Sequence, residues 1–269
     1  MYWGIGAHGR KKKLTTPQSV IITVFGVSRN TISIWKKKDS TMQYWLEHLQ
    51  DIFNYPKIDS IKFNNNSSQF DIDDIKEVFG KETKVKIRNT GCHAFNQMIL
   101  QNFLLVKKLN IMPSNFPNSK ILKRILMQNF DHLDIDSELQ GTTTMTLDEL
   151  LLINSRKSYI GFLRISAKQI NKFIKLWQKG SNPCMEHLYI VNLRSEDSDK
   201  DIVMKGIKHD VIPDNQTRMF KNVGFTDTSL VTGGIDIHRM DGTKATIQIK
   251  KGLMVFTVQM YVWLDHCVV

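Results

Sequence analysis

The sequence predicts an α/β fold of stacked strand–helix units that ends in an antiparallel β meander. Three observations support this prediction: an apolar-x-apolar step recurs along the chain, a helical pattern of apolar residues follows each step, and the C-terminal part alternates between apolar and polar residues. The steps begin at residues 61, 85, 109, 133, 163 and 188, so the spacings are 24, 24, 24, 30 and 25. Such regular spacing is typical of repeat proteins, in which each unit buries its apolar face on its neighbours.

The N-terminal part precedes these repeats and has a different pattern. Residues 1–13 are predicted to form a tail, with three consecutive lysines at 11–13. Within residues 14–56, the segments 20–25 and 31–35 are rich in β-branched residues and predict two strands. The stretch from Met42 to Phe53 has apolar residues three or four positions apart, which predicts a helix.

Residues 57–195 form the predicted repeats. Strands that alternate with helices must run parallel, and about one strand and one helix per 24 residues predicts a leucine-rich-repeat-like solenoid. Two of the later helices begin with capping-box spacing, Thr146 with Glu149 and Ser166 with Gln169. We expect the apolar residues of the steps to be buried against the helices, and these include Ile87, Leu109, Ile111, Leu133 and Ile135.

Residues 196–269 contain the predicted meander. A charged loop and a short helix near residues 202–207 come first. Alternating segments at 234–239 and 245–249 flank Asp241-Gly242, a dipeptide that predicts a type I′ hairpin turn. The stretch from Leu253 to Trp263 reads as the third strand. Repeat proteins need a cap on the last unit, so we expect the meander to be the C-terminal cap.

The residue between the two apolar residues of each step is predicted to point away from the helices. In a solenoid, helices cover one face of the sheet, so these middle residues line its open face. Most of them are polar, although a sheet covered on both faces would have apolar residues there. We predict a partner-binding stripe, with a merely solvated face as the alternative, and its residues are Lys62, Lys86, Arg88, Asn110, Asp134, Arg164 and Tyr189.

The net charge of +11 in 269 residues leaves a basic nucleic-acid-binding solenoid as the alternative function. Against it, the lysines and arginines are spread along the chain, and the sequence has no zinc-finger or RNA-binding aromatic signature. No stretch approaches the roughly 18 uninterrupted apolar residues of a membrane span. We therefore expect neither nucleic acid nor a membrane as the partner.

The sequence offers no pattern for catalysis or for a cofactor. Its glycines lack the spacing of a phosphate-binding loop, and the acids at 71, 73 and 74 suit a helix N-terminus. Cys92, Cys184 and Cys267 are widely spaced, so they predict neither a zinc site nor a disulfide framework. We expect a non-enzymatic protein without metal or cofactor in a reducing compartment, the cytoplasm or the nucleus.

Two ordered motifs carry a family resemblance. The first is the stretch from Gln169 to Trp177 with Gly-Ser-Asn-Pro at 180–183, and the second is Gly-Ile-Asp-Ile-His-Arg-Met-Asp-Gly at 234–242 with Tyr-Val-Trp at 261–263. Together they resemble the type-2 F-box-associated domain that is expanded in nematodes. The similarity runs from about Leu147 to Trp263 and, more weakly, over residues 45–49. On the helix of the first motif, we expect Ile170, Phe173, Ile174 and Trp177 to be buried.

This resemblance implies the substrate-recognition half of a ubiquitin-ligase adaptor, in which an F-box docks on a Skp1-type adaptor and the associated region holds the target. An F-box opens near a Leu-Pro pair, and residues 1–56 contain none. We therefore expect the F-box to be missing, by truncation or divergence, and the isolated chain not to bind a Skp1-type adaptor. The identity of the target, the natural start and the oligomeric state stay open.

Overall fold

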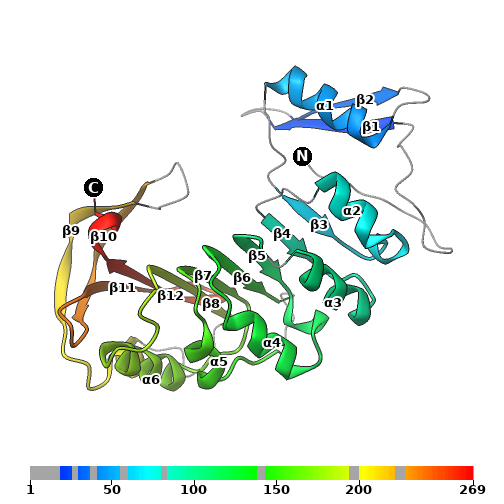
Figure 1. Ribbon diagram of the computed structural model, residues 1–269. Coiled ribbons are helices and arrows are strands. Elements are labelled where there is room, and N and C mark those ends of the chain that lie inside the picture. The colour runs from blue at the N-terminus through cyan, green and yellow to red at the C-terminus, as the bar shows by residue number, and fades with distance from the viewer. Residues whose placement is uncertain are drawn as a thin grey trace. The chain divides into compact units, whose positions relative to one another are not determined.

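A computed structural model describes residues 19–25, 30–36, 41–54, 60–79, 84–103, 105–137, 143–193, 200–221 and 228–268. The chain divides into two compact units, residues 1–109 and 110–269. The fold is mixed α/β, and strands β3 to β12 have the order β3-β4-β5-β6-β7-β8-β12-β11-β10-β9 in a ten-stranded sheet (Figure 1). None of the helices in the described ranges is long and apolar enough to cross a membrane.

The first unit contains a two-stranded sheet and the first strand–helix repeats. Its elements are β1 (Ser19–Phe25), β2 (Asn30–Lys36), α1 (Met42–Phe53), β3 (Ile61–Phe63), η1 (Ser67–Gln69), α2 (Ile72–Phe79), β4 (Lys84–Ile87), α3 (His93–Asn102) and the start of β5 (Lys108–Ile111). β1 and β2 pair antiparallel. The two strands and the helix predicted for residues 14–56 are thereby confirmed, whereas the predicted tail lies outside the described residues.

Burial of alternate residues holds the repeats of the first unit together. β3 and β4 run parallel, with Phe63 opposite Ile87. Phe63 is buried, and its ring meets those of Phe95 and Phe103 edge-on at centroid distances of 6.0 and 5.7 Å. Edge-to-face pairs of this kind add to the free energy gained from burial alone. The core of this unit is thus made by strand residues packed on helix residues, as the repeat pattern predicts.

The second unit continues the repeats and adds the antiparallel strands. Its elements after β5 are η2 (Pro113–Asn115), α4 (Ser119–Leu126), β6 (His132–Asp136), α5 (Leu147–Leu152), β7 (Lys157–Gly161), α6 (Ala167–Gln178), β8 (His187–Leu193), α7 (Lys200–Met204), β9 (Asp210–Lys221), β10 (Thr228–His238), β11 (Lys244–Lys251), β12 (Val255–Trp263) and η3 (Asp265–Cys267). Helices α4, α5 and α6 lie along one face of β6 to β8 (Figure 1).

The predicted core and helix caps are confirmed. The strand residues Ile87, Leu109, Ile111, Leu133 and Ile135 are all buried, and so are Ile170, Phe173, Ile174 and Trp177 on α6. Both capping boxes are formed, because the side chains of Thr146 and Ser166 accept from the backbone of Glu149 and Gln169 while the side chains of those residues accept in return. Each reciprocal pair satisfies two backbone donors that a helix otherwise leaves free.

The strand predicted at residues 162–165 is wrong. β7 ends at Gly161, and Phe162 then has a left-handed backbone with φ 57°. In the parallel register, Ser158 lies opposite Leu133 and Leu188, so a polar residue stands at the core-facing position. This strand therefore lacks the apolar-x-apolar step that marks the other strands. Its core-facing position, Ser158, still lies 25 residues after Leu133, as the repeat spacing requires.

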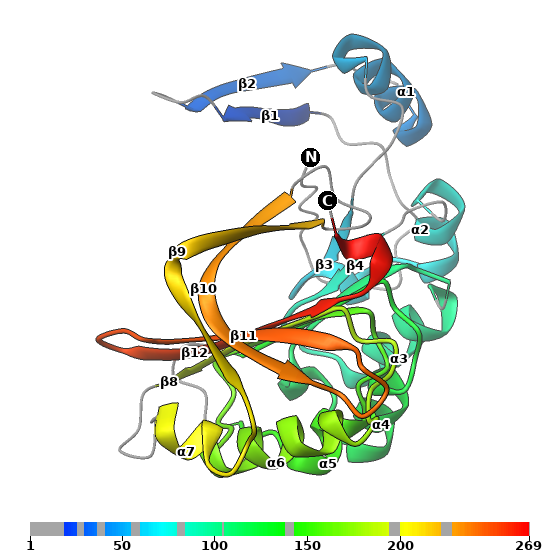
Figure 2. The same ribbon diagram turned by 90° about the vertical axis from the view of Figure 1, so that its left-hand side faces the viewer.

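The antiparallel C-terminal strands are confirmed, with two corrections. β12 pairs antiparallel with β8, and β12, β11, β10 and β9 follow in order, curling strongly as Figure 2 shows. The sequence did not predict β9, whose residues are mostly exposed and do not alternate. The turn between β10 and β11 is not of type I′, since Gly242 has φ 88° but Asp241 is not among the residues with positive φ.

Candidate functional site

The face of the second unit's sheet opposite α4, α5 and α6 carries a row of polar and aromatic side chains. Asp134, Tyr159 and Tyr189 are direct neighbours across β6, β7 and β8. Gln259 of β12 pairs with Tyr189, and Gln248 of β11 pairs with Gln259. Laterally paired residues point to the same side of a sheet, and the residues on either side of them point to the helices. We call these five residues the tyrosine row.

Two tyrosines form the centre of the tyrosine row. The rings of Tyr159 and Tyr189 meet edge-on, with centroids 5.6 Å apart and an interplanar angle of 72°. Both side chains are half-buried. A glycine two residues after Tyr159 makes room for its ring, because a Cβ atom at Gly161 would lie only 2.7 Å from Tyr159 Cε1 and 2.7 Å from Asp136 Oδ1. The two rings thus form a pre-arranged, partly exposed aromatic surface.

Two of the predicted stripe residues lie in this region but are buried. Asn110 Nδ2 donates to Asp134 Oδ2 at 3.1 Å, and Asp134 is only 9% exposed. Asp134 Oδ1 also contacts His132 Nε2. The expectation that Asn110 and Asp134 are open to solvent is therefore wrong, because they hydrogen-bond across neighbouring strands. Tyr189 lies on the sheet face opposite the helices, as predicted.

The other predicted stripe residues lie elsewhere. Arg164 is exposed but follows β7, where its backbone bonds to Thr143 and Met145 in an extended segment. Tyr159 occupies the place in the row that was expected for Arg164. Lys62 and Lys86 are paired neighbours on β3 and β4 of the first unit, and Arg88 follows β4. Lys62 is exposed and the other two are half-buried.

Two titratable groups beside the tyrosine row, His187 and Tyr261, are held neutral. Burial, together with Lys157 and His132, lowers the pKa of His187 from 6.5 to about 4. Gln259 Nε2 donates to Nε2 of neutral His187 at 3.0 Å. Burial and Tyr189 raise the pKa of Tyr261 to about 12. Neither group has the pKa near 7 that general acid–base catalysis favours, so they are suited to stacking and hydrogen bonding.

A second cluster lies where β7 and β8 begin. Glu186 Oε1 accepts from Arg156 Nε at 2.6 Å and lies 2.8 Å from His266 Nε2. The next residue of η3, Cys267, is buried in a small core with Phe220, Val231 and Tyr261. Burial raises the pKa of the Cys267 thiol, and Glu186 raises it further. This cluster joins the C-terminal η3 to the starts of two strands, and sequence reasoning missed it because its members lie far apart in the chain.

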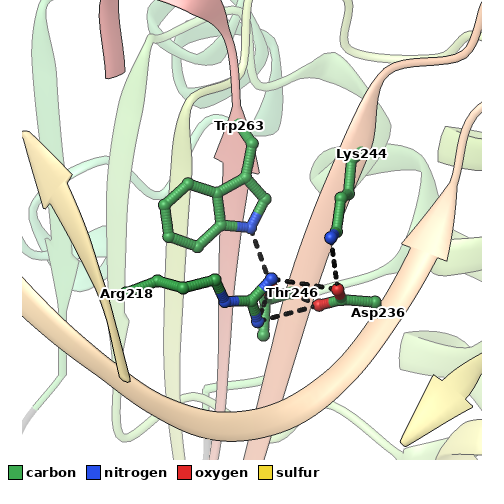
Figure 3. A network of polar contacts seen from close by, with 5 residues as sticks. All are labelled: Arg218, Asp236, Lys244, Thr246 and Trp263. Atoms are coloured by element: carbon green, nitrogen blue, oxygen red, sulfur yellow. Dashed lines mark hydrogen bonds and ion pairs between the residues drawn. The ribbon is translucent and has the colours of Figure 1, made fainter. Parts of the chain in front are cut away.

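A third cluster, drawn in Figure 3, belongs to the curled strands. Arg218 Nη1 and Nη2 donate to the two carboxylate oxygens of Asp236 at 2.9 and 3.0 Å, and Lys244 Nζ lies 2.7 Å from Oδ2. Thr246 Oγ1 donates to Asp236 Oδ1 at 2.6 Å and accepts from Trp263 Nε1 at 2.7 Å. Burial alone would raise the pKa of Asp236, but these hydrogen bonds and the Arg218 charge lower it. Both carboxylate oxygens of Asp236 have partners within the cluster, which indicates a structural role. Arg218 Nε is buried without a hydrogen-bond partner among the described residues.

The residues of the two family motifs also have structural contacts. Trp177 is buried, and the guanidinium of Arg239 lies 5.4 Å from the centre of its ring. Arg239 is held in turn by Asp241 and by Thr243. Asn182 Nδ2 donates to the carbonyl of Ile153 at 2.7 Å, just after α5 ends. The motifs thus tie α6 to the β10–β11 hairpin and to the end of α5.

Comparison with known proteins gives the same family. Residues 121–190 match the family described as F-box associated. The predicted family resemblance is confirmed. This F-box associated segment runs from α4 into β8 and includes the first motif and both tyrosines of the tyrosine row, whereas the second motif lies outside it.

A relative of known name extends the similarity. Over 215 residues, the chain is 25% identical to the F-box associated domain-containing protein sdz-33 of Caenorhabditis elegans. The aligned part is 77% of this chain, and the chain spans 60% of the length of that relative. The similarity to this relative therefore extends beyond residues 121–190.

Proposed function

We propose that the chain is a protein-binding module, and that the tyrosine row holds its target protein. The observation that carries the proposal is the half-buried pair Tyr159 and Tyr189 on the sheet face opposite the helices, within the F-box associated segment. Tyrosines are enriched among the residues that dominate binding energy at protein interfaces. Gln248 and Gln259 extend the same row. Their Nε2 atoms contact the Thr232 carbonyl and His187, and their side-chain carbonyl oxygens can accept from a partner's backbone.

The proposed role in a cell is target recognition for a ubiquitin ligase. The support is the match of residues 121–190 to the F-box associated family. An F-box would couple the module to a Skp1-type adaptor, and we place the protein in the cytoplasm or the nucleus, where such adaptors and reduced cysteines belong. The leucine-rich-repeat-like solenoid stays a prediction.

The experiment compares partners captured by the full chain and by a variant of the row. The variant carries Tyr159→Ser and Tyr189→Ser, and the matched control carries Tyr44→Ser on α1, an exposed tyrosine of the first unit. Proteins from the source organism that bind the chain and the control but not the variant are purified, and their affinities are measured directly. We expect the variant to bind at least tenfold more weakly, since loss of a hot-spot side chain costs about 2 kcal/mol or more.

Equal affinity of the folded variant would move the binding site away from the tyrosine row. Ligase coupling is tested separately by mixing the purified chain with a Skp1-type adaptor. Because residues 1–56 lack the Leu-Pro start of an F-box, we expect no stable complex at micromolar concentration. A complex would show that this chain docks on the adaptor directly.

A further inference from the structure

Glu186, His266 and Cys267 bring three metal-ligating groups together. Glu186 immediately precedes β8, and the other two are consecutive residues of η3. One ligand atom from each lies within 4.8 Å of the other two. Glu186 is 1% exposed and Cys267 is fully buried, whereas His266 is exposed. The tyrosine row does not use these groups.

A buried oxygen of Glu186 needs a partner that the protein does not supply. Oε1 is occupied by Arg156 and His266, but Oε2 is buried and has no hydrogen-bond partner in the described part of the chain. A carboxylate oxygen that leaves water without gaining a partner costs free energy. A carboxylate oxygen of Glu186 lies in the same cluster as the Cys267 thiol and the His266 ring, so a cation bound there could take Oε2 as a ligand.

Arg156 does not exclude a cation. Its contacts with Glu186 are to Oε1, with Nη2 at 2.5 Å, and the same Nη2 lies 3.3 Å from His266 Nε2. Its side chain is 42% exposed, so solvent screens much of its charge. Carboxylates that bind metals are commonly hydrogen-bonded through their other oxygen, which fixes their orientation. The His266 side chain is 48% exposed, and it can ligate a metal either through its other ring nitrogen or by exchanging the contacts of Nε2 with Glu186 Oε1 and Arg156 for the metal.

The ligand types select the metal. Mg²⁺ and Ca²⁺ take oxygen ligands, so a thiol disfavours them. Sulfur, imidazole and carboxylate together are the ligand set of Zn²⁺, which binds four ligands tetrahedrally. A thiolate and a carboxylate also balance the two positive charges of the ion.

We propose that Glu186 Oε2, His266 and Cys267 Sγ bind Zn²⁺, with a water molecule as the fourth ligand. On binding, the Cys267 thiol releases its proton to solvent and the thiolate forms the bond to the metal. The ion would link η3 to the start of β8 and so fasten the C-terminal end of the chain to the sheet. The sequence did not predict this site because Glu186 precedes its partners by 80 residues.

Cobalt(II) is a spectroscopic substitute for zinc. The untagged full chain is titrated with Co²⁺ in a non-thiol reductant. We expect one equivalent to bind, with a thiolate-to-cobalt charge-transfer band and the visible bands of a tetrahedral site, and Zn²⁺ to displace it. Cys267→Ser should abolish the charge-transfer band, and His266→Ala should weaken binding at least about tenfold. Cys184→Ser, which changes an exposed cysteine, is the matched control and should behave as the unchanged chain does.

Circular dichroism shows whether each variant is folded. If Cys267→Ser does not fold, the exposed position of His266 makes His266→Ala the deciding variant. The proposal is overturned if the unchanged chain gives no charge-transfer band, if the band persists in folded Cys267→Ser, if Cys184→Ser loses it, or if His266→Ala binds cobalt with unchanged affinity.

Discussion

His187 is an ionisable residue that the fold keeps uncharged. Its ring packs against Tyr261 and Phe220, with centroid distances of 4.9 and 6.2 Å, and Gln259 hydrogen-bonds to it. Burial and the nearby Lys157 and His132 lower its pKa to about 4, whereas an unfolded chain has a histidine pKa near 6.5. Below pH 6.5 the unfolded state therefore binds more protons than the folded state, so stability falls as the pH decreases.

We predict that His187 makes the free energy of unfolding decrease as the pH falls from about 6.5 toward 4. The total loss from this residue is on the order of 3 kcal/mol, at 1.36 kcal/mol for each pKa unit. His187→Gln keeps a hydrogen-bonding group near Gln259 but has no such titration. Urea unfolding at several pH values should show a shallower loss in His187→Gln, while His238→Gln, at an exposed position, should follow the unchanged chain. Parallel curves for all three would refute the prediction.

The elements that the sequence predicts are those whose packing repeats along the chain. The helices and the strands through Leu109 and Leu133 follow the periodicity, because their apolar residues are buried. The sequence did not predict β7 correctly, because Ser158, a polar residue, takes the core-facing position of that strand. The misplaced strand also affected the predicted binding face. Tyr189 was predicted to lie on that face, but Tyr159 was not, because the strand that contains it was predicted at residues 162–165. Sites that join distant segments, such as Glu186 with His266, leave no local pattern in a sequence.

Leu133 tests the core-facing register of β6. Its side chain is fully buried opposite Ser158. Replacing Leu133 with Ala should lower the free energy of unfolding by about 2–5 kcal/mol, because the protein loses apolar burial and keeps part of the cavity. Leu105→Ala, at a position that is 98% exposed, is the matched control and should change it by less than about 0.5 kcal/mol. Equal midpoints of urea unfolding for both variants would contradict this register.

Ser158 tests the core-facing register of β7, where a substitution is expected to preserve or raise stability rather than lower it. The Ser158 hydroxyl is buried and has no hydrogen-bond partner within the described residues. An unsatisfied buried hydroxyl destabilises a folded protein, so Ser158→Ala should leave stability unchanged or raise it by about 1–3 kcal/mol. Thermal or urea unfolding measures the change. A clear loss of stability would show that the hydroxyl has a partner, such as a buried water molecule.

The whole chain combines a strong positive charge with an uncharged aromatic centre in its proposed binding face. The net charge is +11, yet Tyr159, Tyr189, Gln259 and Gln248 carry no charge at neutral pH. Lys62 and Lys86 lie on paired strands of the first unit. The proposed protein binding would thus depend on the tyrosine row, and nucleic-acid binding would depend on basic residues such as this lysine pair.

Salt dependence separates these two functions. Each phosphate contact makes the logarithm of the binding constant fall by about 0.9 for each tenfold rise in salt, and non-specific binding has dissociation constants of about 10⁻⁴–10⁻⁶ M at physiological salt. We expect duplex DNA and RNA to bind the chain only in this weak, salt-sensitive way, and Lys62→Glu with Lys86→Glu to weaken that binding further. The same charge reversal should leave the affinity for the target protein unchanged. The double variant Tyr159→Ser with Tyr189→Ser should weaken binding of the target protein and leave nucleic-acid binding unchanged. Nanomolar nucleic-acid binding that survives 0.2 M salt would instead favour the nucleic-acid function, because dispersed surface charge does not give such affinity.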